Sequence, residues 1–131
     1  MKTKIKKSVW LLPLLAMLLV LNSCDKEGSA VVKVKVTTAT LIPLPRSGVT
    51  VHMFGSRKGP STLFFMPFHS DKDVVTESDG VATFELRKTD LNGQTTFYFG
   101  VFQGSNTSRN YLGMASVTIK KGETKEISIM Y

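Results

Sequence analysis

The chain has 131 residues and a formal net charge of +7, from 17 basic and 10 acidic residues. Four lysines lie among the first seven residues, so the rest of the chain carries a net charge of only +3, spread without long runs. This balance gives no support for nucleic-acid binding, which requires a strongly basic surface. A single cysteine excludes a disulfide framework within the chain.

The first 23 residues have the pattern of an export signal. Lys2, Lys4, Lys6 and Lys7 precede the uncharged run VWLLPLLAMLLVL, from Val9 to Leu21. A run of this length suits the core of a signal peptide and is shorter than the roughly 20 residues that span a bilayer. We therefore expect residues 1–23 to be a signal peptide that is removed.

The run ends at Leu21-Asn22-Ser23-Cys24, which resembles the lipobox of bacterial lipoproteins. In that family the cysteine thiol is alkylated with diacylglycerol, and the leader is cut just before it. The resemblance implies that Cys24 carries the lipid. Two or more acyl chains hold a protein on a membrane almost permanently, so the membrane is the first expected partner.

Residues 24–29 form the lipidated cysteine and a short polar tether, which resembles two different sorting signals. An aspartate beside Cys24 resembles the inner-membrane retention signal of enteric bacteria. The acidic-and-lysine tract Asp25-Lys26-Glu27 resembles the surface-export signal of Bacteroidetes lipoproteins. We favour an outer-membrane lipoprotein, facing either the periplasm or the cell surface.

Residues 30–131 have the pattern of one all-β domain. Alternation is clearest near its start, where Val32, Val34 and Val36 share one face and two lysines the other. Turn signals at Asp79-Gly80, Asn92-Gly93 and Lys121-Gly122 separate later strands. Strands are expected at 31–36, 49–54, 62–68, 81–86, 95–103, 111–119 and 125–131. About seven short strands in 100 residues predict an antiparallel, immunoglobulin-like β-sandwich.

Two motifs make the fold more specific. Pro43-Leu44-Pro45 precedes Gly48-Val49-Thr50-Val51, and Thr76 to Phe84 reads TESDGVATF. Together with the turn Gly122-Glu123-Thr124 before the last strand, they resemble the carboxypeptidase-regulatory-like or transthyretin-like domain. The resemblance covers residues 31–131 and implies a transthyretin-like β-sandwich. Its motifs are structural, so it implies no activity.

The residues indicate neither catalysis nor a cofactor. His52 and His69 have no partner at a spacing that predicts a triad or a metal site. Asp71, Asp73, Glu77 and Asp79 offer oxygen ligands for Ca²⁺, but Lys72 interrupts them and the glycine and glutamate of an EF-hand are absent. We expect a non-enzyme without a metal or a cofactor.

Aromatic residues are concentrated in the expected strands 62–68 and 95–103. If these strands are neighbours, with Leu63, Phe65, Phe97 and Phe99 inward, one outer face is left apolar. The candidate binding face is then Phe64, Met66, Phe68, Tyr98 and Phe102. Contiguous exposed apolar surface marks a partner or ligand site. The alternative is that residues 55–61 or 104–110 fold over this face as a second small core.

The sequence thus predicts a non-catalytic, lipid-anchored envelope protein that acts as a binding or accessory module for a protein or glycan partner. The alternative is a structural subunit or stalk of a larger outer-envelope assembly, whose edge strands pair with a neighbour.

Overall fold

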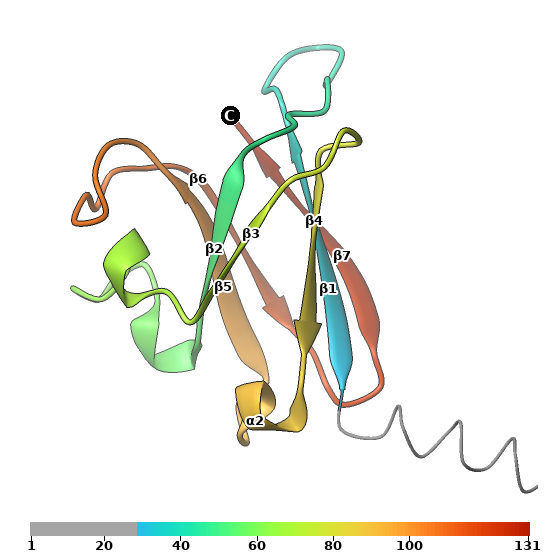
Figure 1. Cartoon of the computed structure of the whole chain (residues 1–131), viewed down its shortest axis with the longest axis vertical. Coiled ribbons are helices and arrows are strands. Elements are labelled where there is room, and N and C mark those ends of the chain that lie inside the picture. Colours follow the sequence, from blue (N-terminus) through green and yellow to red (C-terminus); the bar gives the residue numbers. More distant parts are fainter. Residues whose placement is uncertain (1–28) are drawn as a thin grey trace, which may run out of the picture.

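The computed structural model describes residues 29–131, so the predicted signal peptide, Cys24 and most of the tether lie outside the described residues. The described part is an all-β sandwich of seven strands in two sheets, as predicted (Figure 1). One sheet has the order β4 (Val81–Leu86), β1 (Ala30–Thr37), β7 (Thr124–Met130). The other has the order β3 (Lys72–Val75), β2 (Thr50–Phe54), β5 (Thr96–Phe102), β6 (Tyr111–Thr118).

Alternation along the strands builds the core between the two sheets. Val32, Val34 and Val36 of β1 are fully buried, while Lys33 and Lys35 between them are exposed. Phe84 of β4 meets Phe99 of β5 edge to face, with ring centroids 5.0 Å apart. This geometry suits the charge distribution of the two rings. The core side chains therefore come from both sheets, as the period of two predicts.

The pairing of β1 differs from a purely antiparallel arrangement. β1 pairs antiparallel with β4 but parallel with β7, over seven register positions from Val31↔Thr124 to Thr37↔Met130. All other strand pairs are antiparallel. The first strand, β1, therefore lies at the centre of its sheet, and the last strand, β7, lies beside it at the edge.

The strand directions give the sandwich two ends, which we name the tether end and the far end. The tether end holds the start of β1, the short helices η1 (Ser56–Lys58) and α2 (Lys88–Leu91), and the turn at 119–123. The far end holds the loops at 38–49 and 103–110 and the turn at 76–80 (Figure 1). Among residues 29–131, no helix is long and apolar enough to cross a membrane.

The motifs that carried the family resemblance hold the far end together. Buried Thr76 donates its hydroxyl to the Arg46 carbonyl at 2.6 Å and accepts from the Val49 amide at 2.9 Å. Gly80 has φ +76°, and a Cβ there would lie 2.8 Å from the Val36 carbonyl oxygen. The threonine and the glycine are thus required by backbone geometry, which is a structural and not a catalytic requirement.

The strand predicted at 62–68 is wrong. That segment has no strand; it crosses the outer face of the β3-β2-β5-β6 sheet and ends in the helix η2 (Pro67–His69). Pro67 starts this 3₁₀ turn, because its fixed φ suits a first helical position and it has no N–H for a sheet ladder. The edge strand β3 forms instead at 72–75, where Lys72 and Asp73 are typical of a protected edge.

Candidate functional site

A second group of aromatic rings covers the outer face of the β3-β2-β5-β6 sheet. Phe54 of β2 and Phe65 of the crossing segment are buried, with ring centroids 4.7 Å apart. Phe65 also contacts Phe102 at 5.1 Å and Tyr111 at 5.5 Å. We call these four residues the outer cluster. It is separate from the core between the sheets, because Phe54 and Phe65 point away from that core.

Two glycines let the backbone approach these rings. A Cβ on Gly59 would lie 3.1 Å from the ring of Tyr98, so the crossing segment packs directly against this tyrosine. A Cβ on Gly100 would lie 2.8 Å from the ring of Phe102 and 3.0 Å from that of Phe65. The segment at 55–69 therefore lies tightly on the sheet.

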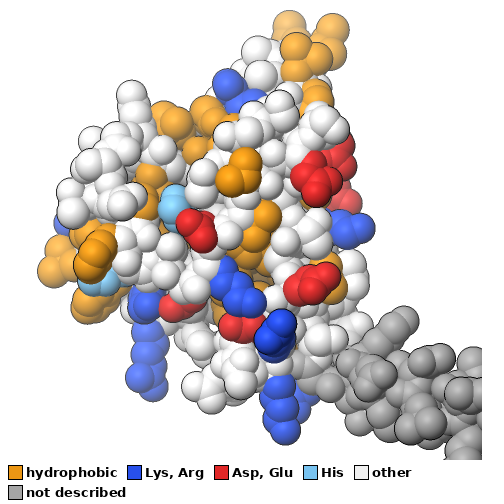
Figure 2. Space-filling view, in the orientation of Figure 1, with side chains coloured by type: hydrophobic (Ala, Val, Ile, Leu, Met, Phe, Trp, Pro, Cys, Tyr) orange, Lys and Arg blue, Asp and Glu red, His pale blue; other side chains and the backbone are white. Residues whose placement is uncertain are grey.

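The same segment presents apolar side chains to solvent. Leu63, Phe64 and Phe68 are 68%, 50% and 69% exposed. His69 stands between the two phenylalanines, with edge-to-face contacts at 5.3 Å to Phe64 and 5.1 Å to Phe68. We call these four residues the η2 surface. In Figure 2 hydrophobic side chains gather around a histidine on this side of the molecule.

The predicted binding face is therefore not one flat sheet surface. Phe64 and Phe68 are exposed, as that prediction requires, but Met66 is half-buried. Tyr98 and Phe102 lie on the outer face of β5, as expected, and are partly covered by the crossing segment. The cause is the missing strand: Leu63 is exposed and Phe65 buried against the outer face, which reverses part of the expected alternation.

A polar loop borders the η2 surface. The amide of Phe68 donates to the carbonyl of Asn106 at 2.9 Å, which ties η2 to the far-end loop at 103–110. Arg109 reaches the Thr62 carbonyl at 3.5 Å. Aromatic rings beside amide and hydroxyl groups are a combination that suits sugars and protein surfaces alike.

A cavity of about 370 Å³ opens between η2 and this loop, lined by His52, Pro67, Phe102, Asn106, Leu112 and Tyr131 among others. Burial lowers the pKa of His52, and the nearby Asp73 carboxylate opposes part of this shift. Ser70 donates its hydroxyl to the Pro67 carbonyl at 2.9 Å, so its oxygen accepts from His52 Nδ1 at 3.3 Å. The neutral imidazole then carries its proton on Nδ1 and leaves Nε2 as an acceptor.

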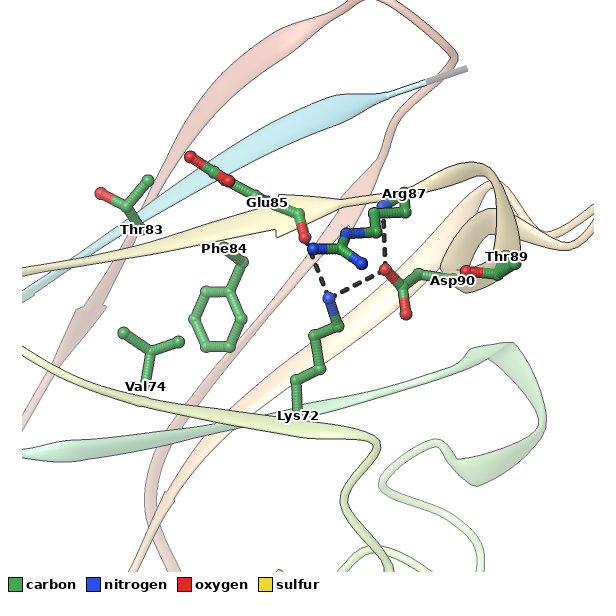
Figure 3. Close-up of a pocket in the computed structure, with 8 residues that line it drawn as sticks. All are labelled: Lys72, Val74, Thr83, Phe84, Glu85, Arg87, Thr89 and Asp90. Atoms are coloured by element: carbon green, nitrogen blue, oxygen red, sulfur yellow. Dashed lines mark hydrogen bonds and ion pairs between the residues drawn. The ribbon is translucent and has the colours of Figure 1, made fainter.

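A second cavity, of about 470 Å³, lies where β3 and β4 form the open side of the sandwich (Figure 3). Lys72 spans the gap between the sheets: its Nζ donates to the Glu85 carbonyl at 3.0 Å and pairs with Asp90 Oδ2 at 2.8 Å. Hydrogen bonds from Lys72 and the Arg87 amide hold the pKa of Asp90 below its usual value, although desolvation opposes them. Lys72 of β3 therefore joins the two sheets, through the Glu85 carbonyl of β4 and Asp90 of α2.

Within residues 29–131, no three histidine, cysteine, aspartate or glutamate side chains cluster as metal ligands. The predicted lipidation site, Cys24, lies outside the described residues. The signal in the sequence is Pro67, which interrupts the expected strand 62–68; it separates the exposed Phe68 from the buried Phe65 and so defines the η2 surface.

No protein-family model and no curated protein matches the chain. Among solved structures, its fold is similar to the minor pilin of Streptococcus agalactiae, with a TM-score of 0.50 and 13% identity over 79% of this chain. The TIE protein of Bacillus anthracis and the shaft pilin of Lactobacillus rhamnosus GG follow, with TM-scores of 0.46 and 0.45 and identities of 12% and 13%, each over 79% of this chain.

This chain spans 44%, 17% and 50% of those three proteins, so it corresponds to part of each. At such identities the likeness shows the fold alone. The chain thus contains an immunoglobulin-like β-sandwich of the kind that also occurs in pilins.

Proposed function

We propose that this chain is a non-catalytic, lipid-anchored protein of the bacterial outer envelope that binds a protein or glycan partner through the η2 surface. The observation that carries the proposal is the exposure of Leu63, Phe64 and Phe68 on a segment that is itself held in place. Exposed aromatic residues on an ordered surface lose little conformational entropy on binding, because they have few rotatable bonds.

The segment is ordered by contacts beneath it. Phe65 is 2% exposed against the outer cluster, and Lys58 Nζ bonds both the His69 carbonyl and Asp71, at 3.0 and 2.8 Å. Phe64 and Phe68 are therefore presented in fixed positions, and their exposure is not a result of loose packing. Burying such rings against a partner contributes about 25 cal/mol per Å² of apolar area.

The test uses the double variant Phe64→Ser/Phe68→Ser in the full chain. We expect its free energy of unfolding to stay within about 0.5 kcal/mol of the native value, because neither side chain is buried. Saturable binding on a glycan array, or fixed-stoichiometry co-purification of one envelope protein, should be lost. Binding that survives in this folded variant would contradict the proposal.

A structural subunit is the second candidate function, because the loop at 38–49, also at the far end, exposes another group of apolar side chains. Leu41, Ile42 and Leu44 are 105%, 77% and 58% exposed, and residues 38–45 carry no charge. The matched variant Leu41→Ser/Ile42→Ser separates the two functions. If it abolishes co-purification while Phe64→Ser/Phe68→Ser does not, the chain assembles through its far end and the first proposal is wrong.

A further inference from the structure

The charges of the described domain are divided unequally between its two ends. Three lysines at the tether end are paired with carboxylates: Lys58 with Asp71, Lys72 with Asp90 and Lys125 with Glu123. Beyond these pairs, the tether end has further exposed basic side chains that form no ion pair within residues 29–131: Arg57, Arg87, Lys88, Lys120 and Lys121. They outnumber the exposed carboxylates of Glu85 and Glu126, which lie near this end on β4 and β7. Blue side chains project from the lower end of the domain in Figure 2.

The far end has no such excess. Its basic residues, Arg46 and Arg109, are balanced by Glu77 and Asp79. Arg46 is also engaged inside the domain: its guanidinium donates to the Tyr131 carbonyl at 2.7 Å and lies 4.2 Å from the centre of the Tyr131 ring. The positive charge of the domain is therefore concentrated at the end where β1 begins.

We propose that the tether end binds the anionic phospholipid surface of the membrane to which the chain is anchored. The unpaired cations come from η1, from the start of α2 and from the turn at 119–123, which follow β2, β4 and β6. They are thus spread over one end of the sandwich and are not gathered in a groove. A distributed cationic surface fits a bilayer of anionic headgroups, which presents its charge over a wide area.

The position of the chain start supports this partner over a soluble anion. The inference rests on the lipid anchor of the proposed function. The six Cα–Cα steps from Cys24 to Ala30 can span at most about 3.5 Å each, or roughly 21 Å in total. The tether end is then the part of the domain nearest the headgroups, where an exposed cation interacts within a Debye length of about 8 Å.

The consequence is a fixed orientation on the membrane. Each lysine or arginine at an anionic surface strengthens binding roughly fivefold, so several together hold the tether end against the bilayer. The η2 surface is tied by Phe68 to the loop at 103–110, and the apolar loop at 38–45 is at the far end. The apolar loop at 38–45 would then face away from the membrane, toward partners. The η2 surface, whose His69 carbonyl also accepts from Lys58 of the tether end, would lie on the side of the domain.

The experiment measures lysine acetylation by a water-soluble reagent and mass spectrometry, on the full lipidated chain in vesicles. Vesicles of phosphatidylcholine with phosphatidylglycerol are compared with vesicles of phosphatidylcholine alone. We expect the acetylation rates of Lys88, Lys120 and Lys121 to fall several-fold in the anionic vesicles. The rates of Lys33 and Lys35, exposed on the outer face of β1, serve as the internal reference and should change less than twofold.

Two variants show whether charge is the cause. Lys120→Gln/Lys121→Gln should remove most of the protection of Lys88 in anionic vesicles, whereas Lys33→Gln/Lys35→Gln, with the same loss of charge, should not. Salt at about 0.5 M should also remove most of the protection of Lys88 in anionic vesicles, because it screens the charges.

The inference would be overturned if Lys88, Lys120 and Lys121 were acetylated as fast as Lys33 and Lys35 in both kinds of vesicle. If they were acetylated more slowly than Lys33 and Lys35 in both kinds of vesicle, the anchor alone would hold this end near the surface. That result also overturns the role of charge but leaves the anchor intact. A chain that does not remain with vesicles at all would instead refute the anchored function itself.

Discussion

The core between the two sheets and the outer cluster bury phenylalanine rings equally well by different means. Phe84 is 1% exposed and Phe65 is 2% exposed. Phe84 lies on a strand that pairs with β1, in a core to which both sheets contribute. Phe65 lies on a segment without strand pairing, whose hydrogen bonds are mostly to its own residues, such as Thr62 to Gly59 and His69 to Met66.

Equal burial therefore does not mean an equal role in stability. The backbone around Phe84 can move only if strand pairing breaks, whereas the segment around Phe65 has no strand pairing to break, so we expect it to open at a lower free energy. Regions held by few long-range contacts open locally, at a lower free energy than global unfolding. The outer cluster thus positions the η2 surface, and the core holds the domain.

The largest effect is expected from Phe84→Ala. It removes a ring from the close-packed core and leaves a cavity between the sheets, which costs about 4 kcal/mol. For a domain whose total stability is about 5–15 kcal/mol, this is a large part of the whole. Urea unfolding followed by far-ultraviolet circular dichroism should show a much lower midpoint. A midpoint close to the native value would mean that the core is less tightly packed than the structure shows.

A smaller and local effect is expected from Phe65→Ala. The loss is near the transfer free energy of the ring, about 2 kcal/mol, because the segment can relax into the vacated space. Hydrogen exchange should become faster for the amides of residues 59–69 and stay slow in β1 and β4. Uniformly faster exchange in all strands would contradict the distinction between the two regions. Phe84→Ala is the control in which all regions should change together.

The smallest effect is a pH dependence of the stability, which we expect from His52 on the outer face of the β3-β2-β5-β6 sheet. Burial lowers the pKa of His52 in the folded domain, so the unfolded chain binds more protons as the pH falls below about 6.5. The contribution of His52 to stability is complete above that value and is lost as the pH falls through its lowered folded pKa. Melting temperatures at pH 7.5 and 5.5, roughly one unit on either side of the ordinary value, measure this. His52→Gln should reduce the difference, and an unchanged difference would assign it to other groups.

The fold was predictable from the sequence because its strands alternate. In β1 and β4 every second residue is apolar, and Gly80, Gly93 and Gly122 have the positive φ that their turn motifs require. The parallel pairing of β1 with β7 was not predicted, because strand pattern carries no information about which strands become neighbours across the whole domain.

The candidate site was predictable only in part. Tyr98 and Phe102 were placed on the outer face by the same alternation, and Phe64 and Phe68 were predicted to be exposed. The segment at 62–68, however, is apolar at nearly every position and has no period, so its direction across the sheet could not be derived. Pro67, through its fixed φ, and the close approach of Gly59 to Tyr98 decide that direction, and the second of these is a tertiary contact.

The parallel β1–β7 pair also determines how the domain carries mechanical load. Ala30 lies at one end of the sandwich and Met130 at the other, on neighbouring strands that run the same way. A force that pulls Ala30 and Met130 apart acts along these strands. Because the hydrogen bonds of a parallel ladder are evenly spaced, such a force shears many of them together and does not open them one at a time.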